Sequence, residues 1–123
     1  MNISNLLKGE ISQKDLLNYY NATIVYEELP DDIQGLVFNY DCIFFILINK
    51  YLSYYLKKKT ILHELAHIEL CQLEQCNQDL FALRSKQYED EADIYIKNIL
   101  NELKEIEWKK QKYYYYFLHY FYC

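Results

Sequence analysis

The first third of the chain carries a short helical pattern of hydrophobic residues followed by a strand-like one. A capping box at Ser12–Asp15 precedes the apolar positions Leu16, Leu17 and Tyr20, and this order predicts a short helix. The segment 23–26 (Thr-Ile-Val-Tyr) is β-branched and aromatic, which predicts a strand. Leu-Pro-Asp-Asp at 29–32 then supplies turn chemistry.

Two further apolar runs, 36–40 and 43–48, are separated by a tight reversal at Asp41. Because so short a connection joins neighbouring antiparallel strands, the two runs are predicted to form a hairpin. The second run is apolar at every position, so both of its faces are hydrophobic. This pattern is typical of a strand that a helix covers.

From about Leu52 the hydrophobic period becomes helical, and neither Gly nor Pro occurs after Gly35. The apolar positions of the first predicted helix recur at spacings of three and four: Leu62, Leu65, Ala66, Leu70 and Leu73. A polar stretch at 72–78 is expected to end or interrupt it. A second helix is predicted at about 87–107, with the apolar face Ala92, Ile96, Ile99, Leu100, Leu103 and Ile106.

These elements predict an α+β fold, in which a small antiparallel sheet packs on two long helices. The length of 123 residues fits one domain spanning 1–123. The aromatic-rich segment 113–123 stands apart in composition. We expect it to pack its rings against the body or a second subunit, with a dedicated partner-binding patch as the alternative.

Charge and composition exclude several classes of function. Thirteen basic and eighteen acidic residues give a net charge of −5, which disfavours non-specific binding to nucleic acid or anionic membrane. No run approaches the ~20 apolar residues of a membrane helix, and the N-terminus lacks the apolar core of a secretory signal. The four cysteines form no CxxC pair. A cytoplasmic protein with free thiols is therefore expected; the oligomeric state stays open.

The chemistry-bearing segment is His63-Glu64-Leu65-Ala66-His67, an H-E-x-x-H motif within the first long predicted helix. Residues four apart share one face of a helix, so His63 and His67 can bind the same Zn²⁺ ion. Glu64 points about 100° around the axis, beside the metal, where it can act as the general base of a metallopeptidase. Two histidines without a metal remain the alternative.

A catalytic zinc site needs a third protein ligand, and the segment Tyr88-Glu89-Asp90-Glu91-Ala92-Asp93 offers carboxylates. Glu89 and Asp93 are four apart, so Glu89 can be the ligand while Asp93 orients a histidine such as His63. Glu91 is the rival ligand. It lies about 200° around the helix from Glu89, so only one of the two can face the metal.

The stretch from about Gly35 to Leu100 resembles the ImmA/IrrE family of metallo-endopeptidases, within the gluzincins. The resemblance rests on the hairpin ending Phe44-Phe45-Ile46-Leu47-Ile48-Asn49, the H-E-x-x-H segment, and Glu89, Ala92 and Asp93, which match an E-x-x-A-D pattern. It implies zincin-like active-site helices and a glutamate ligand at Glu89. Ala66 stands where the family commonly has Gly, and the aromatic end replaces the longer C-terminal part of many members.

The resemblance also implies site-specific cleavage of a helix-turn-helix repressor of a phage or mobile element. The competing hypothesis is a non-catalytic zinc-fold module that sequesters a regulator or toxin partner. A metal-free remnant of the fold is a third.

Four further features near the predicted site are candidates for supporting roles. Tyr95 or Tyr88 can serve as a donor to the oxyanion of the transition state. Cys71, one turn beyond His67, is either a soft ligand or, more simply, a packed side chain. His119 is expected to be structural or exposed. The strand at 43–48 is predicted to offer an edge to an extended substrate.

Overall fold

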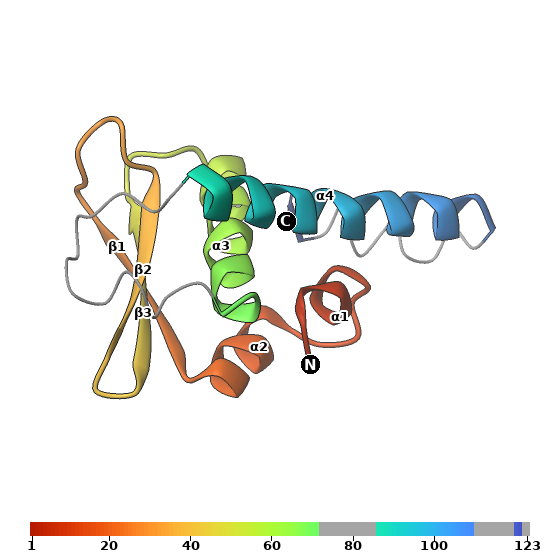
Figure 1. The fold of residues 1–123 in the computed structure, drawn as a ribbon, viewed down its shortest axis with the longest axis horizontal. Coiled ribbons are helices and arrows are strands. Elements are labelled where there is room, and N and C mark those ends of the chain that lie inside the picture. The colour runs from red at the N-terminus through yellow and green to blue at the C-terminus, as the bar shows by residue number, and fades with distance from the viewer. Residues whose placement is uncertain (72–85, 110–119, 122–123) are drawn as a thin grey trace.

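A computed structural model of the chain describes residues 1–71, 86–109 and 120–121, with the side chains of 104–109 left out of that description. Within these residues the elements follow the order helix, helix, three strands, helix, helix (Figure 1). They are α1 (Ile3–Leu7), α2 (Gln13–Tyr20), β1 (Ala22–Glu27), β2 (Gly35–Tyr40), β3 (Ile43–Asn49), α3 (Tyr54–Glu69) and α4 (Lys86–Lys109). The α+β class predicted from the sequence is confirmed.

The sheet has the strand order β1-β3-β2 and is mixed rather than antiparallel. The predicted hairpin of β2 and β3 is antiparallel, with Val37 opposite Ile46 and both turn residues, Asp41 and Cys42, at positive φ. β1 instead pairs parallel with β3, with Ile24 opposite Ile46. The chain reverses once before β2 and again after it, so β1 and β3 run in the same direction.

This order also makes β3 the central strand, so the prediction that it offers a free edge was wrong. Its two edges are occupied by β1 and β2. Among the described strands, the outer edges belong to β1 and β2.

The four helices lie on one side of the sheet, and α3 packs directly against β2 and β3 (Figure 1). Alternate strand residues point toward the helices because side chains alternate between the faces of a strand. Val37, Ile46 and Ile48 form the most buried part of this face. The core continues into the helices through Ile3, Leu6, Leu7, Leu16, Ile61, Leu62, Leu65, Ala92, Ile99 and Leu103.

The helix ends follow local capping chemistry. The predicted capping box of α2 is present, with Ser12 Oγ accepting from the Asp15 amide at 3.1 Å. α1, which was not predicted from the sequence, has its own capping box formed by Asn2 and Asn5. α3 ends at Glu69 with Leu70 as its cap, so the predicted apolar position Leu73 and the polar stretch 72–78 lie outside the described residues.

The predicted apolar face of α4 packs against the core. Ala92, Ile99 and Leu103 are buried, and Ile96 and Leu100 pack against them at partial burial. Ile106 falls outside the described side chains. No helix within 1–71 and 86–109 combines the length and apolar character that crossing a membrane requires.

The C-terminal aromatic segment is described only at Tyr120 and Phe121. Both are buried in the core cluster, and the Tyr120 hydroxyl donates to Gln13 Oε1 at 3.2 Å. The Lys58 ammonium lies 5.0 Å from the centre of the Tyr120 ring, a favourable cation–π distance. These two residues therefore pack against the body, as the sequence predicts for the segment; its other residues lie outside the description.

β2 approaches α3 closely at Gly35. A Cβ atom at this position would lie 2.7 Å from Thr60 Cγ2 and 2.8 Å from the Leu47 carbonyl oxygen. Only glycine permits this approach without a shift of the surroundings. The preceding loop is held by buried Asn49, whose Nδ2 donates to the carbonyls of Leu29 (3.3 Å) and Ile33 (3.1 Å). The loop and the start of β2 are thereby fixed beside α3.

Candidate metal centre

α3 presents the H-E-x-x-H residues from a buried part of the fold. His67 is fully buried and Glu64 is 2% exposed, whereas His63 is half-buried. Ser53 caps the helix, with its Oγ accepting from the Leu56 amide at 3.2 Å. One turn of the helix separates the two imidazole rings, whose centroids lie 4.7 Å apart.

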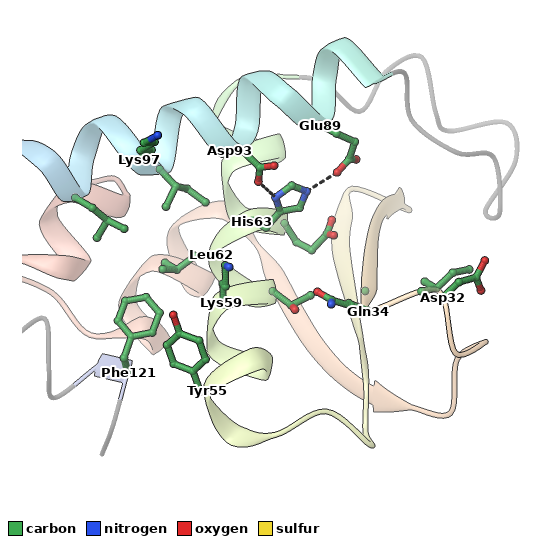
Figure 2. A pocket seen from close by; sticks show the side chains of 16 residues that line it. Asp32, Gln34, Tyr55, Lys59, Leu62, His63, Glu89, Asp93, Lys97 and Phe121 are labelled. Atoms are coloured by element: carbon green, nitrogen blue, oxygen red, sulfur yellow. Dashed lines mark hydrogen bonds and ion pairs between the residues drawn. The ribbon is translucent and has the colours of Figure 1, made fainter.

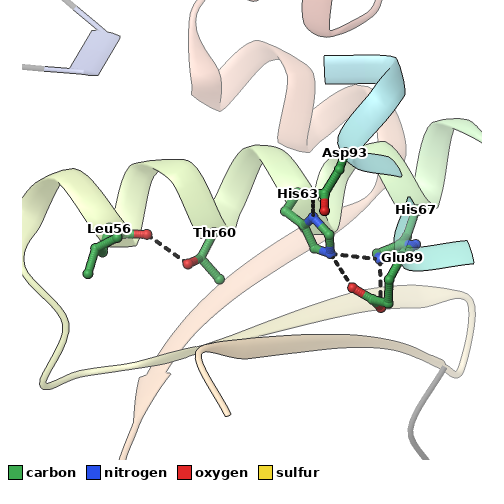
Figure 3. A network of polar contacts seen from close by, with 6 residues as sticks. All are labelled: Leu56, Thr60, His63, His67, Glu89 and Asp93. Carbon is green, nitrogen blue, oxygen red and sulfur yellow. Dashed lines mark hydrogen bonds and ion pairs between the residues drawn. The ribbon is translucent and has the colours of Figure 1, made fainter. Parts of the chain in front are cut away.

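α4 crosses α3 and brings Glu89 and Asp93 to the same rings (Figure 3). Glu89 Oε2 lies 2.6 Å from His63 Nε2, and Glu89 Oε1 lies 3.2 Å from His67 Nε2. Asp93 Oδ1 lies 2.9 Å from the other nitrogen of His63, Nδ1. Because Asp93 engages Nδ1, the other ring nitrogen of His63, Nε2, is the one that faces Glu89 and His67 and would bind a metal.

Charges around His63 and Glu89 shift the pKa values of both groups. Burial opposes protonation of the His63 ring, but the hydrogen bond to Glu89 and the charges of Glu64, Glu89 and Asp93 outweigh it and raise the pKa of His63. Burial likewise opposes ionisation of Glu89, yet its hydrogen bonds with His63 and His67 hold the pKa of that carboxyl far below its usual range. The contact therefore favours a protonated His63 ring beside an ionised Glu89 carboxylate in the metal-free protein.

The donor set fits a zinc ion. His63, His67 and Glu89 each offer one atom, and these atoms all lie within 4.8 Å of one another. Ligands at ~2.1 Å from a tetrahedral ion are separated by about 3.4 Å. The distances of 3.1 Å between the two Nε2 atoms and 3.2 Å from His67 to Glu89 are close to this value. The 2.6 Å between His63 and Glu89 is shorter, a hydrogen-bond length.

A pocket of about 700 Å³ opens beside these residues (Figure 2). His63, Glu64, Glu89 and Asp93 line one part of it. The other lining residues come from the loop before β2, from the first residue of β2, from α3, from α4 and from the C-terminal segment: Asp32, Ile33, Gln34, Gly35, Tyr55, Lys59, Thr60, Leu62, Ile96, Lys97, Leu100 and Phe121. A ligand in the pocket would thus contact the general-base candidate Glu64 as well as His63 and Glu89, whereas the fully buried His67 does not line it.

The structure separates Glu89 from its rival Glu91. Glu89 lies with the two histidines, whereas Glu91 is exposed and its Oε1 accepts from Gln87 Nε2 at 3.0 Å. The roughly 200° between them on the helix accounts for the difference. The geometry therefore favours Glu89 as the third ligand.

Tyr95 lies on a different side of α4 from the pocket. Its hydroxyl donates to Glu69 Oε2, and Tyr95 is not among the residues that line the pocket. This position gives no support to a role as oxyanion donor. Tyr88, the alternative donor, is half-buried and is likewise absent from the pocket lining.

Cys71 follows the end of α3 at positive φ and is exposed, so its side chain neither packs in the core nor joins the donor group. Cys42 is also a free, exposed thiol. His119 lies outside the described residues.

Glu69 lies at the centre of a hydrogen-bond network that was not predicted from the sequence. Glu69 Oε1 accepts from the Ile3 amide at 2.6 Å, while Oε2 accepts from Tyr95. This carboxylate thus links α1 and α4 to the end of α3. A half-buried Glu near the end of a helix carries no spacing signal that predicts such partners.

The comparison with known families agrees with the geometry. A model of a peptidase family, M78, described as the IrrE N-terminal-like domain, matches residues 18–119. That range includes both histidines, Glu64, Glu89 and Asp93. No curated protein and no solved structure matches the chain significantly.

Proposed function

Because the chain belongs to the M78 peptidase family, that of IrrE N-terminal-like domains and of the ImmA/IrrE metallopeptidases, we propose that it is a zinc-dependent endopeptidase. The observation that carries this proposal is the meeting of His63, His67 and Glu89 beside a pocket that Glu64 also lines. Two imidazoles and one carboxylate are a known ligand set of catalytic zinc, which leaves one position for water or substrate.

Each side chain of the proposed site has a distinct task. His63, His67 and Glu89 would hold the ion, and Asp93 would fix the ring and tautomer of His63 through Nδ1. When bound, zinc polarises a peptide carbonyl and lowers the pKa of a coordinated water to ~7. Glu64 accepts a proton from the attacking water and delivers it to the leaving amine. Its burial shields this transfer from bulk solvent.

An extended substrate would lie along β2 rather than β3. β2 is an edge strand among those described, and its first residue, Gly35, lines the pocket. Backbone pairing with an edge strand is a common way to bind an extended peptide. We propose a helix-turn-helix repressor of a phage or mobile element as the natural substrate, on the basis of the family resemblance, and a cytoplasmic site of action.

Metal analysis and two variants test the enzymatic function. The purified protein should contain about one zinc per chain, and His63→Ala should lose it. Cleavage of a pool of N-acetylated, C-amidated peptides, followed by mass spectrometry, should fall by about 10²–10⁴-fold in Glu64→Gln while zinc is retained. Equal cleavage by the wild type and Glu64→Gln would contradict the proposed role of Glu64.

The proposal that a helix-turn-helix repressor is the natural substrate needs a separate test. Co-expression with helix-turn-helix proteins from the same genome should yield a fragment that depends on Glu64. If Glu64→Gln binds such a protein and reproduces every effect of the wild type without cleavage, the non-catalytic sequestering module is the better description.

A further inference from the structure

Two lysines line the pocket beyond the metal-binding section: Lys59 lies one helical turn from His63, and Lys97 lies one helical turn from Asp93. On α3, Tyr55, Lys59 and His63 follow at intervals of four, so they share one face of the helix, and all three line the pocket. On α4, Asp93 and Lys97 are also four apart and both line it. Figure 2 shows Lys59 on α3 and Lys97 on α4, beyond His63 and Asp93. The pocket thus carries a basic section next to the metal-binding section.

The lysines are available to a ligand. Lys59 and Lys97 are exposed, and neither forms an ion pair within the part of the chain that the structure describes. The nearest acid in sequence on α4, Asp93, already faces His63 Nδ1 at 2.9 Å. The pocket is also lined by apolar side chains: Leu62, Ile96, Leu100 and Phe121. The two ammonium groups attract a carboxylate that enters the same pocket.

We propose that Lys59 and Lys97 form a subsite for a carboxylate of the bound peptide. This inference rests on the proposed function, because it places the peptide at the zinc site. One helical turn spans 5.4 Å, and two residues of an extended peptide span about 6.6 Å. The carboxylate therefore belongs to a residue within about two positions of the cleaved bond.

The net charge of the chain cannot account for binding of a carboxylate, because it has the same sign as the carboxylate. At −5, the protein as a whole repels an acidic peptide. The opposite part of the pocket, at Asp32, is acidic as well. A preference for a carboxylate would therefore have to come from the two lysines.

A matched pair of hydroxamates tests the subsite without any need for cleavage. Both probes bind zinc through the hydroxamate; one carries a terminal carboxylate on a short alkyl arm and the other the corresponding amide. With zinc-loaded protein, the carboxylate should bind tighter than the amide by on the order of tenfold. In the double variant Lys59→Gln/Lys97→Gln this ratio should fall toward one.

Lys50→Gln is the matched control, because Lys50 is exposed but does not line the pocket, and it should keep the wild-type ratio. A wild-type ratio near one, or a ratio unchanged in the double variant, would overturn the subsite. Peptide cleavage measured in parallel separates the two proposals. Cleavage without a carboxylate preference refutes the subsite alone, and a carboxylate preference without cleavage refutes only the peptidase. Absence of zinc binding refutes both.

Two peptide series identify the source of the carboxylate. One series is C-amidated and carries Glu or Gln within two residues of the cleaved bond; the other carries Gln and ends in a free or amidated C-terminus. Faster cleavage of the Glu peptide assigns a side-chain carboxylate, and faster cleavage of the free terminus assigns the C-terminal one. No difference in either series would contradict the subsite.

Discussion

Glu89 and Glu91 are two residues apart on α4, and their surroundings differ. Glu89 contacts both histidines, and Glu91 accepts from Gln87 on the exposed side of the helix. Loss of a residue that only hydrogen-bonds to a metal ligand lowers metal affinity by about 10–100-fold. Glu89→Gln should weaken zinc binding by more than this, because it removes a charged ligand. Glu91→Gln, the matched control, should leave it unchanged. Zinc competition with a chromogenic chelator measures both, and the reverse order of effects would contradict the assignment.

The pH dependence of the metal-free protein is a second property of single residues. The pKa of His63 in the folded protein is raised from its ordinary 6.5. The protonated His63 therefore stabilises the fold fully below pH 6.5, and this stabilisation is lost as the pH rises through the higher folded-state pKa. The folded-state pKa of Glu89 is lowered from 4.5, so its contribution is present above that value and is lost as the pH falls. The contact between His63 and Glu89 therefore stabilises the folded protein most between about pH 4.5 and 6.5.

Urea unfolding in EDTA from pH 4 to 9 checks this expectation. The free energy of unfolding of the wild type minus that of His63→Gln should be largest inside the window and should shrink on the alkaline side. A difference that stays constant across the range would show that the contact does not titrate as described.

At the scale of elements, the approach of β2 to α3 depends on Gly35. Gly35→Ala would place a methyl group 2.7 Å from Thr60 Cγ2 and 2.8 Å from a backbone oxygen, so it should lower the free energy of unfolding by about 1–3 kcal/mol. Chemical denaturation measures the loss. Thr60→Ser in the Gly35→Ala background removes one of the two clashes and should recover part of it. No loss in Gly35→Ala would mean that the strand shifts freely.

Local patterns predicted most elements and the pairing of the hairpin, but not how β1 joins the sheet. The hairpin, α2, α3 and α4 follow from capping residues and hydrophobic periods, and α1 was missed because its five residues are too few to show a period. The parallel pairing of β1 with β3 was not predicted, since the alternation of side chains along Ala22–Glu27 is the same in either direction.

At the scale of the whole molecule, the donor atoms come from two helices, so a bound ion would link α3 to α4. The spacing of four within each motif predicted which residues share a face, and the structure brings those faces together. The rest of the pocket, including Asp32, Gly35 and Phe121, could not be predicted, because no local pattern indicates which distant segments meet.

Zinc should therefore stabilise the folded protein globally. At a free zinc concentration 100 times the dissociation constant, the gain is about 2.7 kcal/mol, which raises the melting temperature by on the order of 10 °C. Differential scanning calorimetry with and without EDTA measures this shift. His67→Ala should abolish the shift and Glu64→Gln should retain it. An equal shift in His67→Ala would place the metal elsewhere.

The carboxylate of Glu69 has a practical consequence for how the protein is handled. The Glu69 carboxylate accepts hydrogen bonds from the Ile3 amide and from the Tyr95 hydroxyl. Tyr95 lies two residues after Asp93 on α4, the helix that also carries Glu89. Glu69 therefore links the N-terminal segment to α4. Met1 is exposed, and a purification tag fused ahead of it leaves this junction intact. Trimming the N-terminus through Ile3 removes a donor from a half-buried charge and loosens α4 at the level of the proposed zinc ligands.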